Sequence, residues 1–460
     1  MNFSYLRREP GFYRRVFTLA LPVVLQNLIT TSLGFMDTFM VGLVGQEQMS
    51  AVTVANVPIY IIQLIVFGLQ SGSRVLISQF WGRGDRESIN RVMGIGFFVA
   101  GGISTLCALT MGLFPRQVLM LITDNARLVE LGTSYIRIVG FSYILNSLSS
   151  IYIGMQQSIE NPRFGMTVFA ISTVCNTVGN YILIFGKLGL PALGITGAAI
   201  ATFSSRVVEF VISLVYALRC KQMPLMPACI LRPGKATFRS FVKFSTPVLL
   251  NETLWGTGTS LYTVIMGHMA GNTDLISAYT VAGNIDKMVT VAIFGVAAAA
   301  VIVGKEVGMG GKNAYPIGQA LTFVAFCTGF GVAIAEQLLF WLVLKPHVLP
   351  LFSMTAASAS LCVTMMICYS ISAPLHAFAT TGIVGVLRGG GDVRIAMLID
   401  VLPLWCFTLP LLVLLGLVLH APIAIFCFIM ATESALKVPF GLHRIRGGKW
   451  IHDVTQDLNA

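Results

Sequence analysis

Apolar runs of roughly 20 residues recur along this chain from one end to the other. A helix of that length crosses a hydrocarbon layer about 30 Å thick. Because hydrocarbon offers the backbone N–H and C=O groups no water partner, a chain that spans it must form helices or a closed barrel. The runs are longer and more evenly apolar than the strands of a barrel, which are about ten residues long. The sequence therefore predicts an all-α integral membrane protein.

We predict twelve transmembrane helices and no extramembrane domain, because no long polar stretch separates the apolar runs. Only 11% of the 460 residues are charged, against about 25% in soluble domains. That fraction is too small to cover a surface exposed to water. The predicted spans are residues 16–40, 52–77, 92–114, 132–156, 165–186, 195–218, 245–270, 276–303, 317–343, 358–387, 395–419 and 422–441.

The chain has a formal net charge of +11, and its basic residues are unevenly distributed among the loops. If the N-terminus is cytoplasmic, most Lys and Arg residues fall in loops on the cytoplasmic side, and the largest group lies in the segment 219–243. This bias predicts that both termini are cytoplasmic and that membrane lipid headgroups, not nucleic acid, are the polyanions the chain contacts. The first apolar run lacks a small-residue cleavage site, so we expect a membrane span there and not a signal peptide.

The two halves of the chain resemble each other. Pro22 matches Pro247, and further along Gly68 matches Gly295. Each half holds an even number of predicted spans, so both enter the membrane from the same side as parallel repeats. Transporters of this design hold their substrate near the midplane and alternate its access to the two sides. The predicted parts are an N-terminal six-helix bundle (1–218), a cytoplasmic linker (219–243), and a C-terminal six-helix bundle with a short tail (244–460).

Ionisable side chains within a span cost about 2.5–3.5 kcal/mol on insertion scales, so each is a candidate functional residue. Asp37 has no basic residue within one helical turn. Such a carboxylate either holds a proton or binds a cation, and both properties suit ion coupling. Asn176 and Asn180 lie on one helix face, where their amide oxygens could bind Na⁺ or a protonated Asp37. Hydrogen bonding between helices is the alternative role for both asparagines.

The second half contains three further acids within predicted spans. We assign them to substrate or proton binding, with a structural hydrogen bond as the alternative: Glu252, Asp286 and Asp400. Aromatic residues of this half are assigned to a substrate cavity: Trp255, Tyr262 and Phe378. The second half has no acid at the position that corresponds to Asp37, because the repeat aligns Asp37 with Tyr262. We therefore expect the first half to carry ion coupling.

The other acids in spans are assigned structural roles. Glu209 and Glu433 each have a basic residue one turn away on the same helix, Arg206 and Lys437, and are expected to form local ion pairs. Glu336 lies toward the outer end of its span and is expected to be hydrated.

Motifs of enzymes and cofactor sites are missing from the sequence. The glycine-rich RGGGD that begins at Arg388 lacks the Lys-Ser/Thr of a phosphate-binding loop and is interpreted as a cytoplasmic turn. We find no H-E-x-x-H, no G-x-S-x-G and no C-x-x-C pair. The chain is therefore not expected to be an enzyme, to carry a cofactor, or to bind a metal other than Na⁺.

Several segments resemble the multidrug and toxic compound extrusion (MATE) family. They are ALPVVLQN and MDTFMVG in the first span, and NETLW, GKEVGMGG and VLRGGGD in the second half. The resemblance extends over nearly the whole chain. It implies two six-helix bundles and export of amphiphilic, often cationic compounds, driven by inward H⁺ or Na⁺. It also implies a location in the bacterial cytoplasmic membrane, and we expect a monomer. A flippase for lipid-linked saccharides, which would need basic residues in its cavity, is the alternative.

The resemblance also implies roles for single residues. The ion site of the family's N-terminal half corresponds to the carboxylate of Asp37, the side chains of Asn176 and Asn180, the backbone carbonyl of Ala198 and the hydroxyl of Thr202, with Pro22 as the helix kink. Some members carry an aspartate where this chain has Asn180, so the choice between Na⁺ and H⁺ stays open. Another branch has an acid in span seven, to which Glu252 corresponds.

Overall fold

The computed structural model describes residues 11–269, 272–348, 355–420 and 423–456, and no strand occurs among them. Eleven helical segments in this part of the chain are long and apolar enough to cross a membrane. A twelfth helix, α9, contains 33 residues, which is also enough to span a bilayer. The prediction of an all-α protein with twelve membrane-length helices is confirmed.

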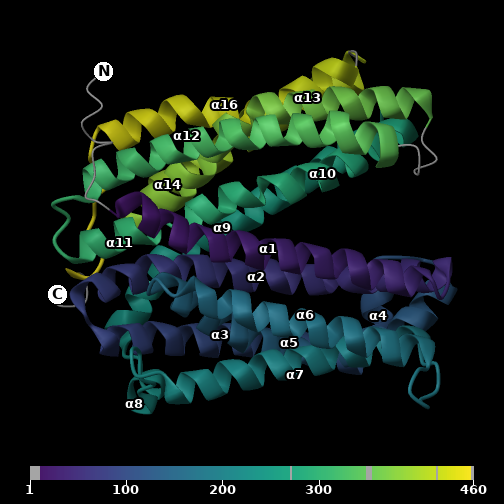
Figure 1. The fold of residues 1–460 in the computed structure, drawn as a ribbon, viewed down its shortest axis with the longest axis horizontal. Coiled ribbons are helices and arrows are strands. Elements are labelled where there is room, and N and C mark those ends of the chain that lie inside the picture. The colour runs from purple at the N-terminus through teal and green to yellow at the C-terminus, as the bar shows by residue number, and fades with distance from the viewer. Residues whose placement is uncertain (1–10, 270–271, 349–354, 421–422, 457–460) are drawn as a thin grey trace. The chain divides into compact units, whose positions relative to one another are not determined.

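The helices follow one another with short connections (Figure 1). The membrane-length segments are α1 (Phe12–Gly42), α2 (Gln46–Arg83), α3 (Arg86–Leu113), α5 (Ala126–Ser158), α6 (Pro162–Phe185), α7 (Gly194–Arg219), α9 (Lys235–Gly267), α10 (Asn272–Ala298) with α11 (Val301–Gly308), α12 (Ala314–Leu339) with η2 (Phe340–Val348), α13 (Ala356–Phe378) with η4 (Ala379–Leu387), α14 (Val393–Leu402) with η5 (Pro403–Thr408), α15 (Leu409–Val413) and η6 (Leu414–Val418), and α16 (Ile423–Arg446). Two short helices, α4 (Pro115–Met120) and α8 (Pro227–Leu231), lie in connections.

Wider π-helical turns, labelled η, interrupt helices of the second half. Pro346 lies inside η2, Pro374 lies in α13 ahead of η4, and Pro403 begins η5. Proline has no N–H to donate, and its ring clashes with the carbonyl of the preceding turn. The chain nevertheless stays helical through each of these prolines, which keeps most of the backbone hydrogen-bonded within hydrocarbon.

The described helices form two compact packing units. One unit is Leu25–Leu249, and the other is Leu250–Gln456 together with the chain up to Val24. Both boundaries fall inside a helix, α1 or α9, just after Pro22 or Pro247. Each of these helices is thus shared between two units. The predicted bundles describe the sequence repeat, whereas these units describe which helix segments pack together.

Matched positions of the sequence repeat make equivalent close contacts. A Cβ atom added to Gly68 in α2 would lie 2.6 Å from the Cδ1 atom of Leu249 in α9. One added to Gly295 in α10 would lie 2.4 Å from the Cγ2 atom of Val24 in α1. Small residues of this kind let membrane helices approach closely. The pairing of these two glycines in the sequence is therefore reproduced in the packing.

Within Leu25–Leu249, helix α5 packs against α2, α3 and α7 (Figure 1). The segment that follows α7 is attached to α3, because Asn90 donates to the Pro224 carbonyl at 3.2 Å and accepts from the Met226 N–H at 3.1 Å. The basic residues of this segment are exposed: Arg219, Lys221, Arg232, Lys235, Arg239 and Lys243.

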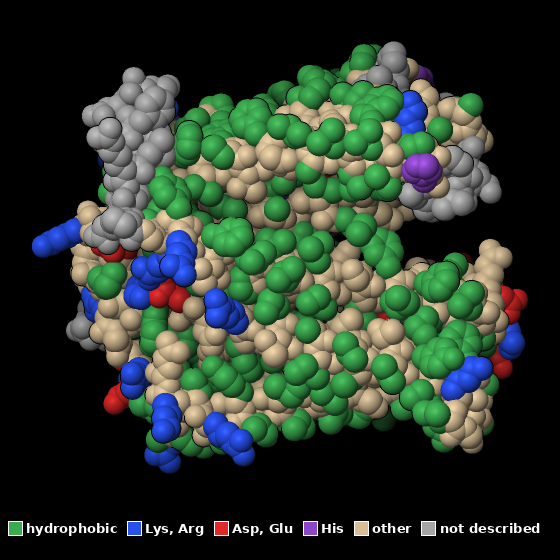
Figure 2. Space-filling view, viewed as in Figure 1, with side chains coloured by type: hydrophobic (Ala, Val, Ile, Leu, Met, Phe, Trp, Pro, Cys, Tyr) green, Lys and Arg blue, Asp and Glu red, His purple; other side chains and the backbone are tan. Residues whose placement is uncertain are grey.

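The flanks of the helices expose apolar side chains, which Figure 2 shows as green over much of the visible surface. In α3 alone, Phe98, Leu106 and Leu113 are more than half exposed, at 54%, 67% and 68%. Exposed apolar surface on this scale would make a soluble protein aggregate, and it is the surface a lipid bilayer covers.

The close approach of α9 to α2 is testable at Gly72. A Cβ atom there would lie 2.6 Å from the Cα atom of Ser245, and backbone cannot move aside as a flexible side chain would. We expect Gly72→Ala to lower the free energy of unfolding by about 1–3 kcal/mol, the usual cost of overpacking. Thermal unfolding in detergent measures it. Gly102→Ala, with nothing within 4 Å of its Cβ, is the control and should not lose stability. Equal melting temperatures would contradict the contact.

Candidate functional site

Four of the predicted ion-site residues form one chain of hydrogen bonds across three helices. Asn180 of α6 donates its amide to the Asp37 carboxylate of α1 at 2.6 Å, and to the Asn176 Oδ1 atom at 2.9 Å. Asn176 donates in turn to the Thr202 hydroxyl of α7 at 3.3 Å. Ala198 is buried on α7 one turn before Thr202. The tertiary structure thus brings together residues that are far apart in the sequence.

This cluster is poor in compensating charge. Both asparagines are 1% exposed, and Asp37 is partly buried. Among the described residues, no Lys or Arg nitrogen lies within 4.0 Å of the Asp37 carboxylate. The Oδ1 atom of Asn180 is buried and has no hydrogen-bond partner in the described structure. A carboxylate beside an open amide oxygen can hold a proton or help to bind a small cation.

The positive charge that acts on Asp37, that of Arg206, is paired with another acid. Arg206 of α7 donates to Glu209 at 2.7 Å, and the second oxygen of Glu209 accepts from Asn146 at 3.1 Å. The predicted local pair of Arg206 with Glu209 is confirmed. Because the guanidinium is bound to Glu209, which is fully buried, it acts on Asp37 only at longer range.

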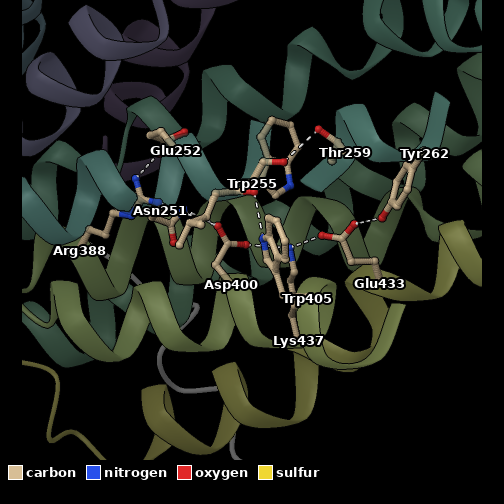
Figure 3. Close-up of polar contacts among 11 residues, drawn as sticks. Asn251, Glu252, Trp255, Thr259, Tyr262, Arg388, Asp400, Trp405, Glu433 and Lys437 are labelled. Atoms are coloured by element: carbon tan, nitrogen blue, oxygen red, sulfur yellow. Dashed lines mark hydrogen bonds and ion pairs between the residues drawn. The ribbon is translucent and has the colours of Figure 1, made fainter. Parts of the chain in front are cut away.

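Charged residues of Leu250–Gln456 form a second and larger network (Figure 3). Arg388, at the end of η4, pairs with Glu252 of α9 at 2.6 Å. Lys437 of α16 contacts Asp400 of α14 at 2.8 Å and Glu433 at 2.6 Å. The predicted pair of Glu433 with Lys437 is therefore confirmed, and the pair is part of a network that joins several helices.

Neutral side chains complete this network. Asn251 donates to Asp400 at 2.8 Å, and Tyr262 donates its hydroxyl to Glu433 at 2.7 Å. Figure 3 shows Glu433 between Lys437 and Tyr262. Three carboxylates thus face two cations, which leaves one formal negative charge in excess if all five groups are ionised. Two of the acids predicted as functional, Glu252 and Asp400, are linked here through Arg388.

The interpretation of the RGGGD segment was wrong as to Arg388. That residue was placed with the basic residues of cytoplasmic loops, yet it is only 3% exposed and is paired with Glu252. Lys437, also 3% exposed, was expected to pair only with Glu433 on its own helix. The one local signal was the spacing of Lys437 from Glu433, whereas the contacts with Glu252 and Asp400 depend on residues distant in sequence.

In the described structure no hydrogen bond or ion pair joins the remaining predicted residues to that network, although Trp255 lies close to it (Figure 3). Asp286 of α10 is partly buried and forms no ion pair among the described residues. Trp255 is 36% exposed. Phe378 is fully buried and stacks on Phe326, with ring centroids 5.2 Å apart, which is the setting of a packing residue. Their assignment to substrate binding stays a prediction.

The expected hydration of Glu336 is wrong. Its side chain is fully buried on α12, where Oε2 accepts from the Ser370 hydroxyl of α13 at 2.9 Å. Oε1 is buried without a hydrogen-bond partner in the described structure. The position along the helix suggested an interface with water, but α10 and α13 cover that face of α12.

Comparisons with known proteins agree with this architecture. A family model described as MatE matches residues 22–182. The chain is 26% identical over 415 residues to the multidrug resistance protein MdtK of Edwardsiella ictaluri, covering 88% of each chain. It is 24% identical over 315 residues to the probable multidrug resistance protein NorM of Thermotoga maritima, covering 67% of each.

A solved structure shares the fold. The chain matches the crystal structure of MATE in complex with MaL6 with a TM-score of 0.84 and 17% sequence identity. The match covers 97% of this chain and 98% of that one.

The charge network can be tested at Lys437. Replacing it by methionine keeps the apolar stem but leaves Asp400 and Glu433 without their shared cation. Removing one partner of a buried ion pair costs about 3–5 kcal/mol, so Lys437→Met should melt at a clearly lower temperature in detergent.

The control for that variant is Arg91→Met. Arg91 pairs with Glu87 at 3.5 Å, and these two side chains are 41% and 64% exposed, so water reaches the pair. Loss of an exposed pair costs about 0–1 kcal/mol. If the two variants melt alike, the buried network does not hold these helices together.

Proposed function

We propose, from the premise that this chain belongs to the MatE family of membrane transporters, that it is a secondary active antiporter. It exports amphiphilic, often cationic compounds from the cytoplasm, and inward movement of H⁺ or Na⁺ drives the export. Curated relatives named as multidrug resistance proteins support this substrate class. A transporter of this kind needs a group whose occupancy by the driving ion changes the stability of one conformation.

The observation that carries the proposal is the cluster around Asp37. A carboxylate on α1 binds Asn180 on α6, and no Lys or Arg nitrogen lies within 4.0 Å of it in the described structure. Since the insertion of such a charge into a membrane is costly, its retention without a cation is typical of an ion pathway. Asn176 and Thr202 supply further oxygen atoms from α6 and α7.

Ion binding at Asp37 would change the contact between α1 and α6. As a carboxylate, Asp37 accepts the amide N–H of Asn180. Once protonated, it becomes a donor, for which the unpartnered Oδ1 atom of Asn180 is a suitable acceptor after rotation of the amide. Na⁺ would instead require oxygen atoms to turn toward it. Either event rearranges the same hydrogen bond and so biases the equilibrium between inward-open and outward-open states.

The flippase alternative needs free positive charge for a phosphate. Within Leu25–Leu249, the guanidinium of Arg206 is neutralised by Glu209 at 2.7 Å, and that of Arg137 is exposed. These contacts favour an exporter of cationic compounds, and dye efflux distinguishes the two functions.

The decisive variant is Asp37→Asn in proteoliposomes. We expect it to lose gradient-driven efflux of a cationic dye by at least tenfold while dye binding in detergent is retained, because the asparagine can neither take up a proton nor carry a charge. Wild-type efflux is measured under separately imposed Na⁺ and H⁺ gradients, and the gradient whose collapse stops export identifies the coupling ion.

Asp124→Asn is the matched control, since Asp124 is exposed in the connection before α5. It should transport as the wild type does. Unchanged efflux by Asp37→Asn would overturn the coupling role of Asp37, and wild-type efflux that responds to neither gradient would overturn the antiport mechanism.

A further inference from the structure

We propose that Glu336 is a second proton-binding carboxyl of this transporter, in the unit that does not contain Asp37. The inference extends the proposed antiport function and rests on it for its role in transport. Glu336 was not among the candidate functional residues of the sequence, and it belongs neither to the Asp37 cluster nor to the network of Arg388 and Lys437.

The first observation is burial without a compensating cation. Glu336 is 0% exposed, and no Lys, Arg or His nitrogen lies within 4.0 Å of its carboxylate in the described part of the chain. The contrast with Asp400 and Glu433 is direct, because both form an ion pair with Lys437. A fully buried carboxylate without such a partner is neutralised by a proton or by a bound cation.

The second observation is the asymmetry of its two oxygen atoms. Oε2 accepts from the Ser370 hydroxyl at 2.9 Å, whereas Oε1 is buried and has no partner in the described structure. Gln337 donates its amide to the Ser370 oxygen at 2.7 Å. The Ser370 hydroxyl hydrogen therefore points away from Gln337, and its two acceptors are Glu336 Oε2 and the Met366 carbonyl, each at 2.9 Å. The Trp341 ring N–H donates to the side-chain oxygen of Gln337 at 2.9 Å, which fixes the orientation of that amide. These hydrogen bonds place a donor at Oε2 of Glu336 and leave Oε1 without one in the described structure.

No positive charge acts directly on Glu336 in the described part of the chain. The ionisable groups that interact electrostatically with Glu336 are Asp286 on α10 and Tyr369 on α13, and neither carries a positive charge. Lys287, next to Asp286, is exposed. Two carboxylates that interact in a buried region do not easily carry a charge at the same time, so their protonation is coupled.

The occupant is a proton and not a metal ion. Hard metal cations take about six oxygen ligands, whereas a single unpartnered carboxylate oxygen is available here. No group of three His, Cys, Asp or Glu residues that could hold a metal occurs among the described residues. In the step itself one O–H bond forms at Oε1, the proton comes from water in the form of hydronium, and nothing is oxidised or reduced. Of the two carboxylates, Asp286 is the more exposed, because it is only partly buried whereas Glu336 is buried.

Infrared difference spectroscopy on the purified full chain tests this directly. The carbonyl stretch of a protonated carboxyl is compared between pH 5 and pH 9 for the wild type and for Glu336→Gln, which keeps the size of the side chain and can still accept from Ser370. We expect the wild type to lose carboxyl intensity as the pH rises, and Glu336→Gln to lack the band that Glu336 contributes to this loss. Glu130→Gln is the control, since that side chain is 72% exposed and paired at the surface.

Two results would overturn the proposal: a wild-type pH difference that Glu336→Gln leaves unchanged, or a Glu336 band that persists at every pH, which marks a permanently protonated structural residue. Ser370→Ala serves if Glu336→Gln does not fold. It removes the hydrogen bond to Oε2 and should shift the frequency of the same band, and an unshifted band would assign the signal elsewhere. Efflux by Asp37→Asn is measured separately, so failure of the antiport function is distinguishable from failure at Glu336.

Discussion

An ionised group that lies away from water must have a partner of opposite charge, a proton or a bound cation, and the polar interior of this protein follows from that requirement. Two buried cations form ion pairs with three carboxylates: Lys437 with Asp400 and Glu433, and Arg388 with Glu252. Such groups join helices and are costly to disturb. Asp37 and Glu336 have no cation in contact within the described structure, and it is at such groups that an ion from solution can alter the balance between conformations.

A second constraint concerns the backbone. Hydrocarbon leaves no route for unpaired peptide groups, so proline within a span has to be absorbed by the helix itself. Pro22 and Pro247 lie where α1 and α9 pass from one packing unit to the other. Gly68 and Gly295 allow the segments next to those prolines to pack closely on α2 and α10. A proline in the shared helix and a glycine in the helix it packs on thus occur in both halves. Together they let one helix belong to two units without exposing its backbone.

How much of the candidate site is predictable depends on how local its signals are. Asp37 stands out because an acid without a neighbouring base inside an apolar run is visible in a short window, and Asn176 and Asn180 share a helix face by spacing alone. The pairs of Glu433 with Lys437 and of Glu209 with Arg206 are visible for the same reason. The partners of Arg388 are not, since Glu252 and Asp400 lie on other helices.

The sequence by itself determined the all-α membrane architecture and the twelve helices, because these rest on the length and order of apolar runs, which packing does not alter. It also showed the repeat, through prolines and glycines that recur in the same order. Only the tertiary structure decided which charges are neutralised. Glu336, near the end of its span, looked accessible to water, and Arg388 looked like a loop residue. Both are buried, because helices distant in sequence cover them. Solvation of a side chain is set by its neighbours in space, and a single sequence does not specify those neighbours.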